Sequence, residues 1–186
     1  MSMVFDRFKY VVAALLLSTG ISTPVWGQET VLDDLFQDLA EADPSEAARL
    51  ETQIINEWEK SGSPAMDLLL RRGKDALEGG QPEVAIEHFS ALVDHAPNFA
   101  EGYYGRASSY YFLGLTGPAL DDIAQTLRLN PRHFEAMRGL AIVMEDLDRP
   151  GDALEIYRMI MDIHPHSVQA IEASERLALQ LEGQSL

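Results

Sequence analysis

The 186-residue sequence contains no cysteine. This absence excludes disulfides, zinc sites built on thiolates, thiol nucleophiles and lipid attachment at a cysteine. Cations are also scarce, because 14 Lys and Arg residues stand against 30 Asp and Glu residues, for a formal net charge of −16. No run of Lys or Arg gathers these cations into a patch. The charge pattern therefore argues against binding to nucleic acid or to an anionic membrane surface.

The sequence also lacks the short motifs that mark common catalytic sites. It has no G-x-S-x-G turn, no phosphate-binding loop and no H-E-x-x-H zinc motif. His164 and His166 flank Pro165, but no set of Asp, Glu and His stands at ligand spacing beside them, and the histidines are expected to be ordinary loop residues. Paired acids such as Asp121 and Asp122 are expected on solvated helix faces. We therefore expect no enzyme activity, no cofactor and no metal.

Residues 1–27 have the layout of a cleavable export signal. Arg7 and Lys9 form a basic start, an apolar run follows over Tyr10–Leu17, and a small residue, Gly27, closes the segment. Charged, apolar and small parts come in the order of a secretory leader, with cleavage expected directly after Gly27.

The alternative is that the segment stays attached as a membrane anchor. Its apolar run is shorter than the roughly 20 residues that cross a bilayer, and Pro24 interrupts it. We therefore expect export across the inner membrane, to the periplasm in a Gram-negative cell, and no membrane insertion after cleavage.

The rest of the chain is organised by an interval of 34 residues. Small residues, bulky apolar residues and prolines recur at this interval in a fixed order: Gly73, Ala107 and Ala141; Ala85, Ala119 and Ala153; Phe89, Ile123 and Tyr157; and Pro97, Pro131 and Pro165. A period of 34 with these marks indicates stacked helix–turn–helix repeats. We expect an all-α fold with repeats at residues 66–99, 100–133 and 134–167.

The segments on both sides of the repeats are also predicted to be helical. Residues 28–65 are acidic and have the apolar periodicity of two helices, which Asp43 and Pro44 separate. We expect this pair to cover the open face of the first repeat. It is alternatively a degenerate fourth repeat, because Trp58 lies 34 residues before an apolar residue of the first repeat. Residues 168–186 are expected to form a capping helix and a tail.

The repeated marks resemble the tetratricopeptide repeat pattern, which runs W-x2-L-G-x2-Y, then A-x3-F, then P. The resemblance covers about 100 residues, and it departs from the family at the leading tryptophan, where Leu69, Tyr103 and Met137 stand. It implies a right-handed superhelix, an α-solenoid with flanking capping helices. It also implies a concave groove, lined by the first helix of each repeat, that typically takes a peptide or helix from another protein.

The resemblance places nine residues of this sequence in that groove: Leu70, Lys74, Leu77, Tyr104, Ser108, Tyr111, Phe112, Arg138 and Ile142. The second repeat is the most informative, because aromatic side chains that face a groove are typical anchors for a bound peptide. The alternative is that the N-terminal helices fold into the groove and bury these rings. The Lys and Asn set with which some family members grip a C-terminal carboxylate is absent.

These features favour an exported adaptor that binds a peptide or helix of another envelope protein. Two alternatives stay open. The chain is an accessory subunit of an envelope enzyme or assembly complex, or it is a structural protein that associates with itself, in either case without separable peptide binding.

Overall fold

The structure, a computed structural model, describes residues 26–184, so nearly all of the predicted export signal lies outside the described residues. Residues 26–184 form nine α-helices and no strand, and none of these helices has the length and apolar character needed to cross a bilayer. The helices are α2 (Trp26–Glu41), α3 (Pro44–Trp58), α4 (Pro64–Glu78), α5 (Pro82–His95), α6 (Ala100–Phe112), α7 (Thr116–Leu129), α8 (Phe134–Asp146), α9 (Pro150–Ile163) and α10 (Val168–Gln184).

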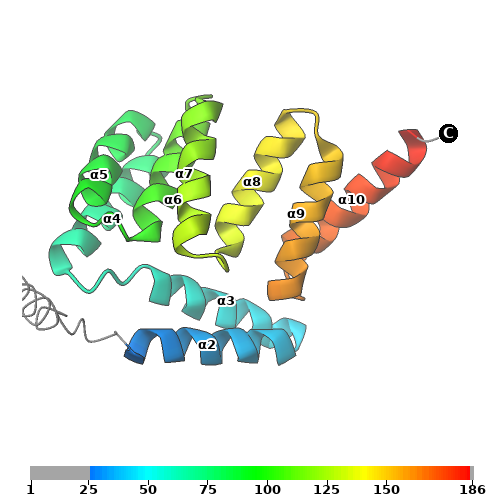
Figure 1. The fold of residues 1–186 in the computed structure, drawn as a ribbon, viewed down its shortest axis with the longest axis horizontal. Helices are drawn as coiled ribbons and strands as arrows, with labels where there is room; N and C mark the ends of the chain where they lie inside the picture. Colours follow the sequence, from blue (N-terminus) through cyan, green and yellow to red (C-terminus); the bar gives the residue numbers. More distant parts are fainter. Residues whose placement is uncertain (1–25, 185–186) are drawn as a thin grey trace, which may run out of the picture.

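The helices from α4 onward form a row of antiparallel pairs (Figure 1). Helix α4 packs on α5, α6 on α7 and α8 on α9, and the second helix of each pair packs on the helix that follows it. Helix α10 continues the row after α9, as the predicted capping helix. The predicted all-α fold, a right-handed solenoid of helix–turn–helix repeats, is confirmed.

Each pair turns at a residue with a positive φ angle, and these residues are again 34 positions apart. The φ angles are 70° at Gly80, 72° at Gly114 and 56° at Asp148. Glycine adopts this left-handed region without steric penalty, and Asp is among the few other residues that visit it. The next backbone N–H then donates to a carbonyl of the first helix, at 2.9 Å in each case: Gln81 to Ala76, Leu115 to Tyr110 and Arg149 to Met144. The repeat interval therefore extends from side chains to backbone conformation.

The ring of Phe89 fills the contact between the first two pairs. It is fully buried against Gly73 of α4 and Gly105 of α6. A Cβ atom added at Gly73 would lie 2.5 Å from this ring, and one added at Gly105 would lie 2.4 Å from it. The ring thus occupies the space that a side chain would need, which explains the small residue that opens the first repeat. Ala107 and Ala141 occupy the same position in the next two repeats and are buried.

We predict that Gly105→Ala lowers the free energy of unfolding by about 1–3 kcal/mol, because the added methyl group forces Phe89 out of its site. The matched control is Gly117→Ala in α7, where an added Cβ atom meets nothing within 4 Å. Urea unfolding followed by circular dichroism measures both variants. The control should be as stable as the parent protein, and equal midpoints for the two variants would contradict this packing.

The junction between α2 and α3 forms as the sequence predicts. The Asp43 carboxylate accepts hydrogen bonds from the backbone N–H groups of Ser45, at 2.8 Å, and Glu46, at 3.1 Å. Pro44 is the first residue of α3, where its missing N–H costs nothing. These contacts fold the two helices back on each other.

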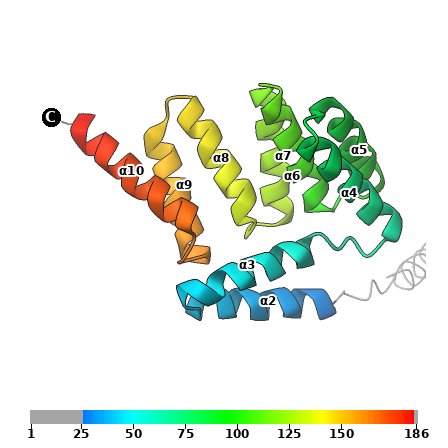
Figure 2. The same ribbon diagram turned by 180° about the vertical axis from the view of Figure 1, so that it is seen from behind.

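The N-terminal pair, α2 and α3, lies in a different place from the one predicted. Figures 1 and 2 show it crossing the ends of the other helices, from the side of the first repeat towards α9 and α10. It does not stack on α4 as a leading repeat, and the prediction that it covers the open face of the first repeat is wrong.

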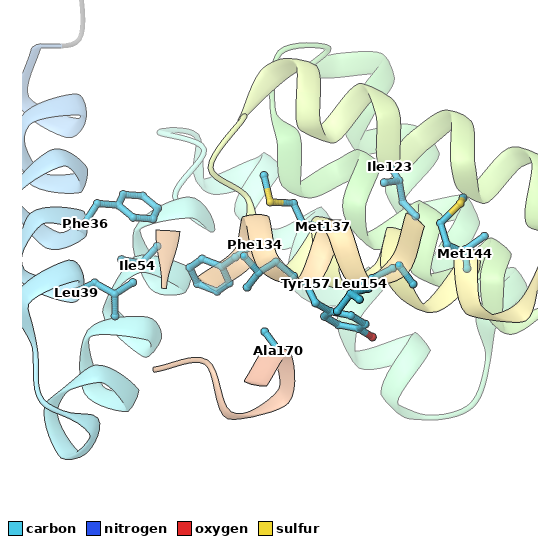
Figure 3. Close-up of a cluster of buried hydrophobic side chains, with 14 of the residues drawn as sticks. Phe36, Leu39, Ile54, Ile123, Phe134, Met137, Met144, Leu154, Tyr157 and Ala170 are labelled. Atoms are coloured by element: carbon cyan, nitrogen blue, oxygen red, sulfur yellow. The ribbon is translucent and has the colours of Figure 1, made fainter. Parts of the chain in front are cut away.

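The reason for this placement lies in where the apolar side chains are buried. Figure 3 shows Phe36, Leu39 and Ile54 of the N-terminal pair directed towards Phe134, at the start of α8, with Ala170 of α10 close by. All of these residues belong to one core that extends into the second and third repeats, whereas the first repeat has a separate core around Phe89. The apolar stripe of the pair is therefore buried against the starts of α8 and α10.

Candidate partner-binding groove

The first helices of the repeats, α4, α6 and α8, line two adjoining hollows. The inner hollow, of about 300 Å³, is also bounded by Ile55 and Glu59 of α3, whereas no residue of α3 lines the outer hollow, of about 360 Å³. Each of the nine residues that the family resemblance placed in the groove lines one hollow or the other. Leu70 and Lys74 line the inner hollow, Tyr111, Phe112, Arg138 and Ile142 line the outer hollow, and Leu77, Tyr104 and Ser108 line both.

A column of three rings holds α3 beside the inner hollow. The ring centroid of Trp58 lies 4.4 Å from that of His133, which lies 4.8 Å from that of Tyr104. Trp58 also packs on Phe134, with 4.8 Å between ring centroids, and only 7% of Trp58 is exposed. The ring of Tyr104 is therefore covered from the side of α3, as one of the alternatives for the groove aromatics predicted.

The polar groups of His133 are satisfied inside this column. The backbone N–H of Ala136 donates to Nδ1 of the imidazole at 3.1 Å, so the His133 side chain caps α8. With Nδ1 acting as the acceptor, Nε2 carries the proton and donates to Oε1 of Glu101 at 2.8 Å. His133 lies between two helices, as the histidines were expected to, but it is fully buried and structural. A single histidine in a loop carries no periodic signal that would have revealed this role.

A second buried histidine ties the far end of α3 to the repeats. His164, between α9 and α10, lies with Nε2 3.3 Å from Oε2 of Glu51 in α3. This hydrogen bond keeps the pKa of the Glu51 carboxyl below its ordinary value, although burial acts in the opposite direction. Within residues 26–184, no three His, Cys, Asp or Glu side chains gather in an arrangement that could hold a metal ion.

The two cations predicted for the groove are already paired with carboxylates. Lys74 forms an ion pair with Glu59 of α3, and Arg138 forms one with Glu135 at 3.1 Å. Burial raises the pKa of the Glu135 carboxyl. Burial alone would lower the pKa of Lys74, but the hydrogen bond and the charge of Glu59 raise it above its ordinary value. Neither cation is therefore free to grip the carboxylate of a partner.

The outer hollow keeps its aromatic side chains accessible. The exposed fraction is 39% for Tyr111, 69% for Phe112 and 37% for Ile142. Beneath them, Ala107 and Val143 are buried and belong to the core of the repeats. The surface is thus a fixed apolar floor with projecting side chains, a form that suits the apolar residues of a bound segment.

Tyr111 is also held in place by a contact between two repeats. Its hydroxyl donates to Oδ2 of Asp146 at 2.7 Å, which links the end of α6 to the end of α8. The hydrogen bond to Asp146 raises the pKa of the Tyr111 hydroxyl. Because this ring is oriented before any ligand arrives, binding to it requires little further loss of side-chain entropy.

The comparison with protein families agrees with the geometry. The sequence profile described as "Tetratricopeptide repeat" matches residues 70–116 and 104–168. A TPR repeat-containing protein of Rhizobium etli is 30% identical to this chain over 153 residues, which are 82% of this chain and 75% of that protein. The small glutamine-rich tetratricopeptide repeat-containing protein 2 of Saccharomyces cerevisiae is 25% identical over 131 residues, which are 70% of this chain and 37% of that protein.

Solved structures with a similar fold come from several settings. The Sgt2 TPR domain from Aspergillus fumigatus has a TM-score of 0.61 at 20% identity and covers 66% of this chain and 83% of its own. The MamA protein has a TM-score of 0.58 at 22% identity and covers 86% of this chain and 84% of its own. The first TPR of Spaghetti (RPAP3), bound to the HSP90 peptide SRMEEVD, has a TM-score of 0.59 at 20% identity and covers 63% of this chain and 93% of its own. At these identities the likeness concerns the fold alone.

We predict that Trp58→Ala lowers the free energy of unfolding by about 3–5 kcal/mol, because it removes the ring that joins α3 to His133 and Phe134. Trp58→Phe should lose clearly less, since a ring remains in the site. Limited proteolysis should cut the alanine variant first within residues 26–63, before the repeats. Equal protease resistance of the alanine variant and the parent protein would show that Trp58 does not anchor the N-terminal pair.

Proposed function

The chain belongs to the tetratricopeptide repeat family, a class of protein–protein interaction domain, and we propose that it is an exported adaptor that binds a segment of another envelope protein. The observation that carries the proposal is the outer hollow. Tyr111, Phe112 and Ile142 project over a fixed floor at a place that α3 leaves open. Large rings in such a position supply much contact area at little entropic cost.

The proposed binding surface is narrower than the groove that the family resemblance predicts. Helix α3 bounds the inner hollow, and the ring of Tyr104 is occupied by its contact with His133. Export and an envelope partner rest on the charged, apolar and small pattern of residues 1–27. The segment that binds is then a short one, seated on the outer hollow rather than along the whole concave surface.

An acidic C-terminal peptide is a poor match for this surface. The RPAP3 structure named above holds the peptide SRMEEVD. In this chain Lys74 and Arg138 are paired with Glu59 and Glu135, so an acidic peptide would meet carboxylates and no free cation among these residues. Like charges brought together at an interface weaken binding.

We predict that Tyr111→Ser together with Phe112→Ser lowers partner capture at least about tenfold, because anchoring rings carry most of the free energy of binding at such sites. Both rings are substantially exposed, so helicity by circular dichroism should not change. Tyr104 is left intact, because its ring packs on His133 and its replacement would disturb the fold. Leu179→Ser, at an exposed apolar residue of α10, is the matched control.

The partner itself is identified by a photo-crosslinking amino acid placed at Phe112 or, as the control, at Leu179. In an envelope fraction, the residue at Phe112 should crosslink a second protein that the residue at Leu179 does not reach. Crosslinks from Phe112 only to copies of this chain would favour the self-associating structural protein. Equal crosslinks from both positions would favour an accessory subunit held over a broad surface, and either result would reject the adaptor.

A further inference from the structure

The outer hollow combines an apolar floor with a negatively charged rim. We propose that it binds a short cationic segment of another protein, in which apolar side chains are flanked by Lys or Arg. This inference rests on the proposed function and names the chemistry of the partner. It is carried by charge complementarity, which comes from the helix ends, from two carboxylates at the rim and from the pairing of the nearby cations.

Three helices end at the rim of the outer hollow. Helices α4, α6 and α8 end at Glu78, Phe112 and Asp146, and Figures 1 and 2 show these ends on the side of the molecule away from α2 and α3. Each helix C-terminus carries about half a negative charge, which a basic residue in the last turn usually offsets. None of these three helices has a basic residue in its last turn. The three ends therefore add their negative potential at one place.

Two carboxylates at the rim add formal charge to this potential. Glu78 and Asp146 are both exposed, and within residues 31–183 neither forms an ion pair. The recorded contact of Asp146 is with the neutral hydroxyl of Tyr111. The cations that come closest to this surface are paired elsewhere: Lys74 with Glu59, Arg138 with Glu135, and Arg176 with Glu145. A cation supplied by the partner would meet charges that the chain itself leaves unpaired.

The apolar part of the surface sets the second requirement. The outer hollow has a volume of about 360 Å³, and Leu77, Phe112 and Ile142 line it together with buried core residues. A purely charged segment would leave this apolar surface in water, whereas an apolar residue between two basic ones covers it and meets Glu78 and Asp146 at the rim. The binding free energy then comes from the apolar contact, and the charges supply orientation and a fast association rate.

The occupant is a different protein and not a second copy of this chain. The formal net charge is −16, so two copies repel each other as they approach. A cationic partner is attracted by the same field, and its association rate falls as salt is added.

Two fluorescent peptides that share their leucines test the proposal, one with lysine at every remaining position and one with glutamate there. The purified protein should bind the Leu/Lys peptide and not the Leu/Glu peptide at physiological ionic strength. Glu78→Lys together with Asp146→Lys should weaken binding of the Leu/Lys peptide about tenfold and create binding of the Leu/Glu peptide. The matched control is Glu87→Lys together with Asp121→Lys, which changes the net charge equally on the exposed faces of α5 and α7.

The outcomes separate this inference from the proposed function. If both peptides bind equally and both lose binding when Tyr111 and Phe112 become serine, the hollow binds segments but the cationic inference is overturned. If the control pair weakens the Leu/Lys peptide as much as the rim pair does, the attraction is diffuse and the inference is overturned as well. Binding of neither peptide also overturns it, and crosslinking from Phe112 then decides the proposed function independently.

Discussion

Trp58 is stacked on His133, with 4.4 Å between the ring centroids, and this contact determines which part of the concave surface is open. It holds α3 beside the inner hollow, where Ile55 and Glu59 form one boundary. The ring of Tyr104, on the other side of His133, is thereby removed from the set of available anchors. What remains accessible is the outer hollow, at the far ends of α4, α6 and α8.

The acidic residues of the chain divide into two groups along the same boundary. Near α3, carboxylates are matched by nearby hydrogen-bond donors, as in the contacts of Glu101 with His133 and of Glu59 with Lys74. At the opposite rim, Glu78 and Asp146 have no cation beside them in the described part of the chain. Burial explains the first group, because a carboxylate that leaves water needs a donor. Solvent supports the second group until a partner arrives.

Much of the fold could be predicted from the interval of 34 residues. The interval repeats because each helix pair solves the same packing problem, and it identified the helix pairs, the small residues at the helix contacts and the nine groove residues. The place of the N-terminal pair could not be predicted in this way. Its apolar stripe shows that α3 must be buried, but the stripe is equally suited to any apolar surface, and the interval from Trp58 to the first repeat pointed to the wrong one. His133 was not recognised because its role depends on a tryptophan that is distant in the sequence.

The measurement that tests this account most directly locks α3 in place and then asks whether the outer hollow still binds. Because the natural chain has no cysteine, Glu59→Cys and Lys74→Cys introduce a unique pair that a short bismaleimide can join across the inner hollow. The account predicts that the crosslinked protein binds its partner, or the Leu/Lys peptide, as tightly as the same variant before crosslinking. Loss of binding on crosslinking would contradict it, since the ligand would then need the surface beneath α3.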